Sequence, residues 1–168
     1  MIGFMGAGKS LIGHSLSQRL KLPFFDLDRQ IEIRHACSVS DFFQIHGEPE
    51  FRKEETVILK ETVGLNDSFV LASGGGTPCF FGNMEWMNKK GITVYLNILP
   101  AALSKRLKRD RRNRPLIASL SDQELTLFVE KTLKEREEYY RMSQIEITPE
   151  NYSPHSLIDH LVSRILEV

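Results

Sequence analysis

Apolar positions along the chain recur in two spacings, which predict helices and strands in alternation. In residues 10–20, Ile12, Leu16 and Leu20 fall on one helical face, whereas residues 68–73 form a short apolar run typical of a buried strand. The predicted helices cover residues 10–20, 49–63, 82–90, 121–140 and 153–165, with short helices over residues 29–47 that end at Gly47 and a helix that begins at Pro100 and runs into the basic segment 105–114. The predicted strands cover residues 24–28, 68–73, 92–97 and 144–148. This alternation favours an α/β fold with a parallel sheet.

Length and composition are those of one ordinary globular domain. The chain has 168 residues, 41% of them hydrophobic, and no repeat, linker or low-complexity tract, so we expect a single domain over residues 1–168. Its apolar runs are far shorter than the roughly 18 residues that span a bilayer, and no charged-then-apolar leader precedes the first motif, so we expect a cytoplasmic protein without a membrane partner. Cys37 and Cys79 are too few for a disulfide framework or a metal cluster.

The strongest motif is the segment from Gly3 to Ser10 (GFMGAGKS), which matches the phosphate-binding pattern G-x-x-x-x-G-K-[ST]. Its glycines let backbone N–H groups surround phosphates, Lys9 would bridge the β- and γ-phosphates, and Ser10 would ligate Mg²⁺. A chance match within a structural glycine turn is the alternative, but the helix that the mechanism requires follows at once. The strand before the loop is reduced to Met1 and Ile2, although strands usually have about five residues. We therefore expect a shortened strand that upstream residues would stabilise.

Two acids, Asp26 and Asp28, end the predicted strand 24–28, where open α/β sheets build their sites. Residues two apart share one face of a strand, so both carboxylates are expected to line one site. Asp26 would hold Mg²⁺ through water, and Asp28 would reach a substrate hydroxyl as a base or an orienting group. The alternative is that both acids only cap the following helix.

Six motifs in order along essentially the whole chain resemble the shikimate kinase family. They are the phosphate loop, Asp26-Leu27-Asp28, Phe51-Arg52-x-x-Glu55, Gly74-Gly75-Gly76, Arg114-Pro115-Leu116 and Arg136. The resemblance implies a three-layer sandwich of the P-loop NTPase type, with a central, mainly parallel five-stranded sheet flanked by helices. It also implies a mobile lid near residues 107–121 and a substrate-binding region near residues 29–60. The implied activity is transfer of the γ-phosphoryl group of ATP, with Mg²⁺, to the 3-hydroxyl of shikimate on the route to the aromatic amino acids, by a monomer.

The resemblance also implies roles for individual residues. Lys9, Asp28 and Arg114 would be catalytic, and Ser10 and Asp26 would serve the metal. The implied nucleotide-binding residues are Gly6, Ala7, Gly8, Lys9, Ser10, Leu11, Arg106, Arg114 and Pro154. The implied shikimate-binding residues are Asp28, Phe43, Phe51, Arg52, Gly74, Gly75, Gly76 and Arg136, of which the two arginines would clamp the carboxylate.

Taken singly, the arginines have simpler interpretations. Arg52 is typical of a surface ion pair, and Arg136, within Glu135–Glu138, is typical of a solvated helix face. A small carboxylate nevertheless suits planar bidentate donors, which arginine supplies and lysine does not. The family commonly has Arg-x-Pro-Leu-Tyr at the second clamp, whereas this chain has Arg136-Glu137-Glu138-Tyr139-Tyr140 without the proline.

The basic segment 105–114 holds seven cationic residues in ten positions. Because it has no interleaved aromatic residue and the chain has zero net charge, we expect a flap over a polyphosphate and no nucleic-acid partner. Arg111 or Arg112 is an alternative to Arg114 in this flap. Two rival functions stay open: another small-metabolite kinase of this fold, such as one resembling gluconate or nucleotide kinases, and a nucleotide-binding regulatory module without turnover.

Overall fold

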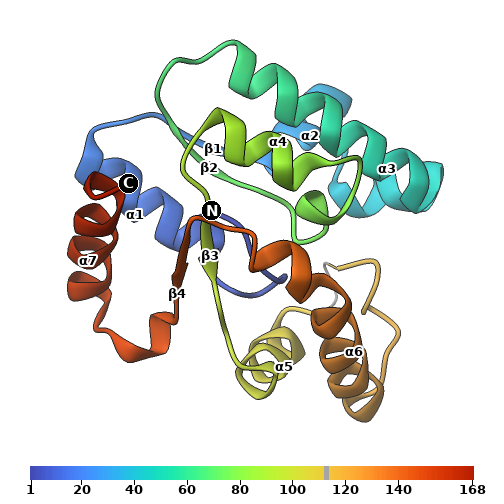
Figure 1. Cartoon of the computed structure of the whole chain (residues 1–168). Coiled ribbons are helices and arrows are strands. Elements are labelled where there is room, and N and C mark those ends of the chain that lie inside the picture. The colour runs from blue at the N-terminus through green and yellow to red at the C-terminus, as the bar shows by residue number, and fades with distance from the viewer. Residues whose placement is uncertain (112–113) are drawn as a thin grey trace.

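The computed structural model describes residues 1–111 and 114–168 (Figure 1). The described residues form four strands: β1 (Phe24–Asp26), β2 (Val70–Ala72), β3 (Val94–Leu96) and β4 (Ile145–Ile147). Their helices are α1 (Lys9–Leu20), α2 (Leu27–His35), α3 (Val39–Gly64), α4 (Asn83–Lys90), α5 (Pro100–Arg109), α6 (Asp122–Tyr140) and α7 (Pro154–Leu166), with 3-10 turns η1 (Thr77–Cys79) and η2 (Pro149–Asn151). Helices and strands alternate as the hydrophobic pattern predicts.

The strands lie in two parallel pairs, β1 with β2 and β3 with β4. Met1 and Ile2 lie between the pairs. The Met1 ammonium donates to the Leu71 carbonyl at 2.6 Å, and Ile2 exchanges hydrogen bonds with Val94 and Leu96 at 2.8 and 3.0 Å. The predicted parallel arrangement is confirmed for both pairs, and two residues of chain connect them.

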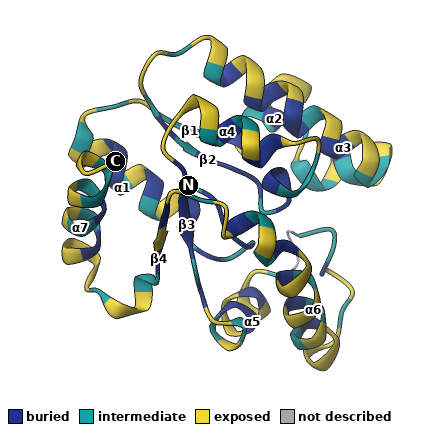
Figure 2. Ribbon diagram, viewed as in Figure 1, coloured by how far each residue is buried: buried dark blue, intermediate teal, exposed yellow. Residues whose placement is uncertain are grey.

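Helices cover the strands: β2, β3 and β4 are mostly buried, whereas β1 is half-buried and teal in Figure 2. Helix α1 packs against α7 and β2, α2 packs against α3, and α5 packs against α6. All three residues of β3 are buried, which agrees with an apolar run that does not alternate with polar positions. The phosphate loop follows Ile2 and the glycine turn (residues 74–76) follows β2, so both lie at the carboxyl ends of the strands.

One boundary differs from the sequence-based expectation. The strand expected over residues 24–28 ends at Asp26, because the Asp26 side chain caps helix α2 from its first turn. The short helices expected over residues 29–47 are α2 and the first part of α3, and the expected break at Gly47 is confirmed by its non-helical φ of 76°. Helix α3 then continues to Gly64, and α5 ends at Arg109 within the basic segment.

The expected lid, residues 107–121, begins in the last turn of α5 and leads to the Ser121 cap of α6. Lys108 and Arg111 both form ion pairs with Asp122, at 3.2 and 3.3 Å, and Arg111 also donates to the Leu120 carbonyl at 2.6 Å. Arg112, one of the alternatives to Arg114, lies outside the described residues. No helix within the described ranges is both long and apolar enough to cross a bilayer.

Candidate active site

The phosphate loop turns sharply before helix α1. Gly6 and Gly8 have φ of 79° and 97°, a left-handed conformation that glycine adopts without strain. The Ala7 N–H donates to the Phe4 carbonyl at 3.1 Å, and the first helical bond runs from the Ile12 N–H to Gly8. The N–H groups of the first turn of α1 thus have no acceptor within the helix, and they give the loop a positive end.

Lys9 is buried within this loop. Its Nζ donates to the Gly3 and Phe4 carbonyls, each at 3.0 Å. Burial lowers the pKa of Lys9 to about 8, although the negative charge of Asp28 acts in the opposite direction. A triphosphate on the loop would add negative charge beside this ammonium and favour its charged form.

Asp26 connects the loop to helix α2. Its Oδ2 accepts a hydrogen bond from the Ser10 hydroxyl, and its Oδ1 accepts from the N–H groups of Asp28 and Arg29 at 3.1 and 3.4 Å. The expectation that Asp26 and Asp28 share one face of a strand is therefore wrong, because the helix begins between them. Asp26 caps the helix, as the alternative interpretation predicts, and it also lies next to Ser10.

Asp28 lies in the first turn of α2 and is open to the cleft described below. The surrounding protein partly shields Asp28 from water, and this desolvation, together with the negative charges of Glu55 and Asp26, raises the pKa of Asp28 to about 6. A carboxyl of that pKa is ionised at neutral pH and is close in proton affinity to an efficient general base.

A cleft of about 280 Å³ opens beside the phosphate loop. Its lining includes all eight residues expected to bind the acceptor: Asp28, Phe43, Phe51, Arg52, Gly74, Gly75, Gly76 and Arg136. Arg114 lines it as well. These residues come from α2, α3, the turn after β2, the segment after α5, and α6. The fold therefore brings together residues that lie more than a hundred positions apart in the sequence.

Arg52 is only 5% exposed and is held on several sides. Its Nη1 donates to Glu55 at 2.6 Å, its Nη2 donates to Glu48 at 2.8 Å, and its guanidinium lies 5.1 Å from the ring centres of both Phe51 and Phe80. Because the guanidinium is so constrained, it is preorganised for a planar anion.

Arg136 is also buried, at 8% exposed, and lies over the Phe4 ring with 5.7 Å to its centre. Its Nη1 has no hydrogen-bond partner among the described residues. A buried donor without a partner is costly, so this atom needs an acceptor that the described protein does not supply. A carboxylate bound in the cleft would supply such an acceptor.

Each of the three glycines after β2 packs closely against a different group. A Cβ on Gly74 would lie 2.0 Å from Glu55 Oε1, one on Gly75 would lie 3.0 Å from the Met5 nitrogen, and one on Gly76 would lie 2.6 Å from Arg52 Cζ. This turn therefore contacts both the phosphate loop and the buried Arg52–Glu55 pair, and side chains would separate them.

Of the residues expected near the nucleotide base, Arg106 contacts the phosphate loop, and no hydrogen bond joins Pro154 to that loop among the described residues. Arg106 donates to the carbonyls of Gly6 and Ala7 at 3.4 Å and pairs with Glu150 at 2.9 Å, so it lies against the phosphate loop. Pro154 and Leu11 are exposed in the first turns of α7 and α1. Arg114 pairs with Asp110 at 3.0 Å at the cleft.

Two residues of the site were not assigned a role from the sequence. Glu55 is 1% exposed and accepts a 2.8 Å hydrogen bond from the Thr77 hydroxyl as well as the contact from Arg52. Its sequence signals are its spacing of three from Arg52 and its place in the motif Phe51-Arg52-x-x-Glu55, neither of which indicates burial. Tyr140 donates to the Gly75 carbonyl, and nothing in the sequence pairs these two positions.

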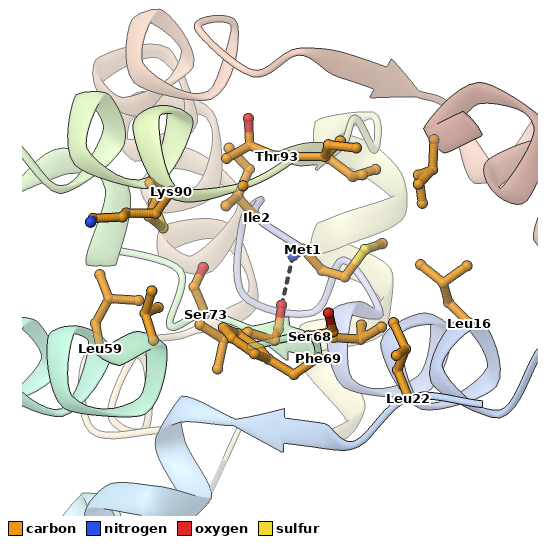
Figure 3. Close-up of a pocket in the computed structure, with 18 of the residues that line it drawn as sticks. Met1, Ile2, Leu16, Leu22, Leu59, Ser68, Phe69, Ser73, Lys90 and Thr93 are labelled. Carbon is orange, nitrogen blue, oxygen red and sulfur yellow. Dashed lines mark hydrogen bonds between the residues drawn. The ribbon is translucent and has the colours of Figure 1, made fainter. Parts of the chain in front are cut away.

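A second cavity, of about 380 Å³, lies at the opposite ends of the strands (Figure 3). Its lining includes Met1, Leu16, Leu59, Phe69 and Thr93. The labelled side chains surround the Met1 ammonium, whose hydrogen bond to the backbone is drawn as a dashed line. Burial lowers the pKa of that ammonium to about 5. Met1 and Ile2 both line this cavity, and none of the expected site residues does.

A phosphate loop beside a cleft with an acid and two buried arginines defines a P-loop phosphotransferase with a small anionic acceptor. The shikimate kinase family model matches residues 5–167. The curated shikimate kinase of Azobacteroides pseudotrichonymphae is 39% identical over 98% of this chain and 97% of its own length. The crystal structure of shikimate kinase from Bacteroides thetaiotaomicron has a TM-score of 0.90 at 35% identity, over 99% of this chain and 98% of that one.

A further solved structure, shikimate kinase from Acinetobacter baumannii in complex with shikimate, has a TM-score of 0.90 at 32% identity, over 99% of this chain and 90% of that one. The chain thus belongs to the shikimate kinase family. It is an enzyme that uses ATP to phosphorylate shikimate in aromatic amino acid biosynthesis.

Proposed function

We propose that shikimate binds in the 280 Å³ cleft and receives the γ-phosphoryl group on its 3-hydroxyl. The observation that carries this proposal is the pair of buried arginines, Arg52 and Arg136, on the same cleft as Asp28 and directly beside the phosphate loop. The arginines bind the ring carboxylate, and Phe43, Phe51 and the glycine turn enclose the ring. The rival gluconate or nucleotide acceptors do not require two buried guanidinium groups in this arrangement.

The transfer itself needs few covalent roles from the protein. The ionised Asp28 carboxylate accepts the proton of the 3-hydroxyl, the hydroxyl oxygen forms a bond to the γ-phosphorus, and the bond from that phosphorus to the β–γ bridging oxygen breaks. Lys9 and Arg114 offset the negative charge on the transferring group and on the leaving ADP. Positioning and charge thus supply most of the catalysis.

The neighbouring Ser10 hydroxyl and Asp26 carboxylate fit a magnesium ion. Mg²⁺ prefers oxygen ligands, commonly uses only one or two protein groups, and completes its shell with water and phosphate oxygens. This agrees with the finding that no cluster of three or more metal-ligating side chains exists within the described ranges. Ser10 would hold the ion directly and Asp26 through water. When bound, the ion neutralises phosphate charge.

The nucleotide is enclosed by the remaining residues. The N–H groups of the phosphate loop and of the first turn of α1, from Gly6 to Leu11, hold its phosphates. Arg106 and Pro154 border the adenine, and the segment 107–121 closes as a lid that brings Arg114 over the phosphates. Met1 and Ile2 act as the central strand of a five-stranded parallel sheet, because hydrogen bonds join them to the pairs on both sides. We further propose that residues 1–168 act as one domain, as a cytoplasmic monomer.

A coupled assay of ADP release tests the site assignment. We expect ADP release that depends on shikimate and Mg²⁺, with phosphate on the 3-oxygen of the product, and no stimulation by gluconate or nucleoside monophosphates. Stimulation by one of these acceptors and none by shikimate would establish the rival kinase. Binding of ATP without turnover of any acceptor would establish the regulatory module.

A further inference from the structure

Tyr140 ends helix α6, one turn after Arg136 and on the same helical face. It is 0% exposed, and its hydroxyl donates to the Gly75 carbonyl at 2.5 Å across 65 residues of sequence. Its ring packs against Tyr95, with ring centres 5.1 Å apart. Tyr140 therefore joins the helix that carries one proposed clamp arginine to the glycine turn that lies against the other.

The glycine turn lies between the phosphate loop and the Arg52 guanidinium. Gly75 lies against Met5 of the phosphate loop, and the next residue, Gly76, lies against the Arg52 guanidinium. Van der Waals contact limits how close these groups come, but contact alone does not prevent the turn from moving away. The hydrogen bond from the Tyr140 hydroxyl to the Gly75 carbonyl opposes that movement, because moving the turn away would break it.

We propose that Tyr140 is a positioning residue for binding of the acidic acceptor. Its hydrogen bond fixes the glycine turn relative to the Arg136 guanidinium. This inference rests on the proposed role of the cleft. Arg136 has a buried Nη1 with no partner among the described residues, so its alignment toward a carboxylate depends on how α6 is held at this end. Burial raises the pKa of Tyr140 well above its usual range, so the hydroxyl keeps its proton over the working pH range.

Tyr140→Phe removes the hydroxyl and keeps the ring, and Tyr95→Phe is its matched control. Tyr95 is equally buried and stacks on the same ring, but its hydroxyl points toward Asn97, 3.5 Å away, and not toward the glycine turn. We expect Tyr140→Phe to raise the KM for shikimate about tenfold, since the Gly75 carbonyl loses its donor and the glycine turn is no longer held against helix α6. The KM for ATP stays within about twofold, and Tyr95→Phe leaves both values unchanged.

A double-mutant cycle with Arg136→Ala separates positioning from general stability. In the Arg136→Ala background, Tyr140→Phe should change the shikimate KM by less than half its effect in the wild-type background, on a logarithmic scale. Thermal melts of each variant identify any loss of folded protein.

Full additivity, an equal effect of Tyr95→Phe, a parallel rise in the KM for ATP, or a wild-type shikimate KM in Tyr140→Phe would each overturn the inference. Failure of the proposed function itself would look different, because the unchanged protein would then show no shikimate-dependent turnover.

Discussion

Gly76→Ala tests the proposed binding of the shikimate carboxylate by Arg52 with the smallest possible perturbation, a single methyl group. The backbone at Gly76 has φ −92° and ψ −20°, which alanine adopts without strain. The added Cβ, however, would lie 2.6, 2.7 and 2.9 Å from Cζ, Nη1 and Nη2 of Arg52. Because non-bonded carbon atoms are normally about 3.5–4.0 Å apart, the guanidinium has to move by about 1 Å.

A shift of that size changes the contacts that orient Arg52. Its Nη1 is 2.6 Å from Glu55 Oε2, so a displacement of about 1 Å takes this pair beyond the usual hydrogen-bond limit of about 3.2 Å, or moves the guanidinium off the substrate carboxylate. A hydrogen bond to a charged group contributes about 1.5–3 kcal/mol. We therefore expect the KM for shikimate to rise about 10- to 150-fold.

The assay is initial-rate ADP release with shikimate varied at saturating ATP, and then the reverse. Gly64→Ala is the matched control, since no atom lies within 4 Å of its added Cβ and alanine at the end of helix α3 adds slightly to stability. The KM for ATP should stay within about twofold in both variants. A folded Gly76→Ala protein with a wild-type shikimate KM would refute the assignment of Arg52 to the carboxylate.

The remaining predictions concern Lys9, Asp28 and the cavity beside Met1. Lys9→Ala should lower kcat by orders of magnitude while the thermal midpoint stays close to wild type; a fall in kcat of less than tenfold would contradict its role. A carboxyl is ionised only above its pKa, so kcat/KM for shikimate should rise with pH through about 6 as Asp28 ionises. For ATP, kcat/KM should fall above about pH 8 as Lys9 loses its proton; flat profiles would contradict both assignments. Four β-forming apolar residues placed before Met1 should fill the 380 Å³ cavity and raise the melting temperature, whereas four Gly/Ser residues should not; equal melting would contradict this.

Local motifs in the sequence predicted local structure well. The phosphate loop follows from its own residues, because Gly6 and Gly8 take left-handed conformations and Lys9 begins the helix. The Ser121 cap follows in the same way, since its hydroxyl and the Glu124 carboxylate accept each other's backbone N–H groups. The strand expected to continue to Asp28 failed for an equally local reason, because an aspartate that accepts two following N–H groups starts a helix.

Burial of polar groups was not predictable in this way. Arg136 lies within a run of charged residues that is typical of a solvated helix, and only the packing of α6 beside the Phe4 ring buries it. Glu55 has the spacing of a surface ion pair with Arg52, yet it is 1% exposed. Both cases depend on contacts between distant segments, which hydrophobic spacing along one helix does not describe.

The glycine turn explains how two separate binding regions hold a fixed distance. Glu55 and Arg52 pack against Gly74 and Gly76, and the phosphate loop packs against Gly75, so one stretch of backbone sets the separation between the Arg52 guanidinium and the phosphate loop. An in-line transfer is sensitive to errors of about 1 Å, and backbone contact defines such a distance better than long side chains do. A substitution in this turn should therefore impair the substrate whose binding group it displaces, which is why Gly76→Ala is expected to separate shikimate from ATP.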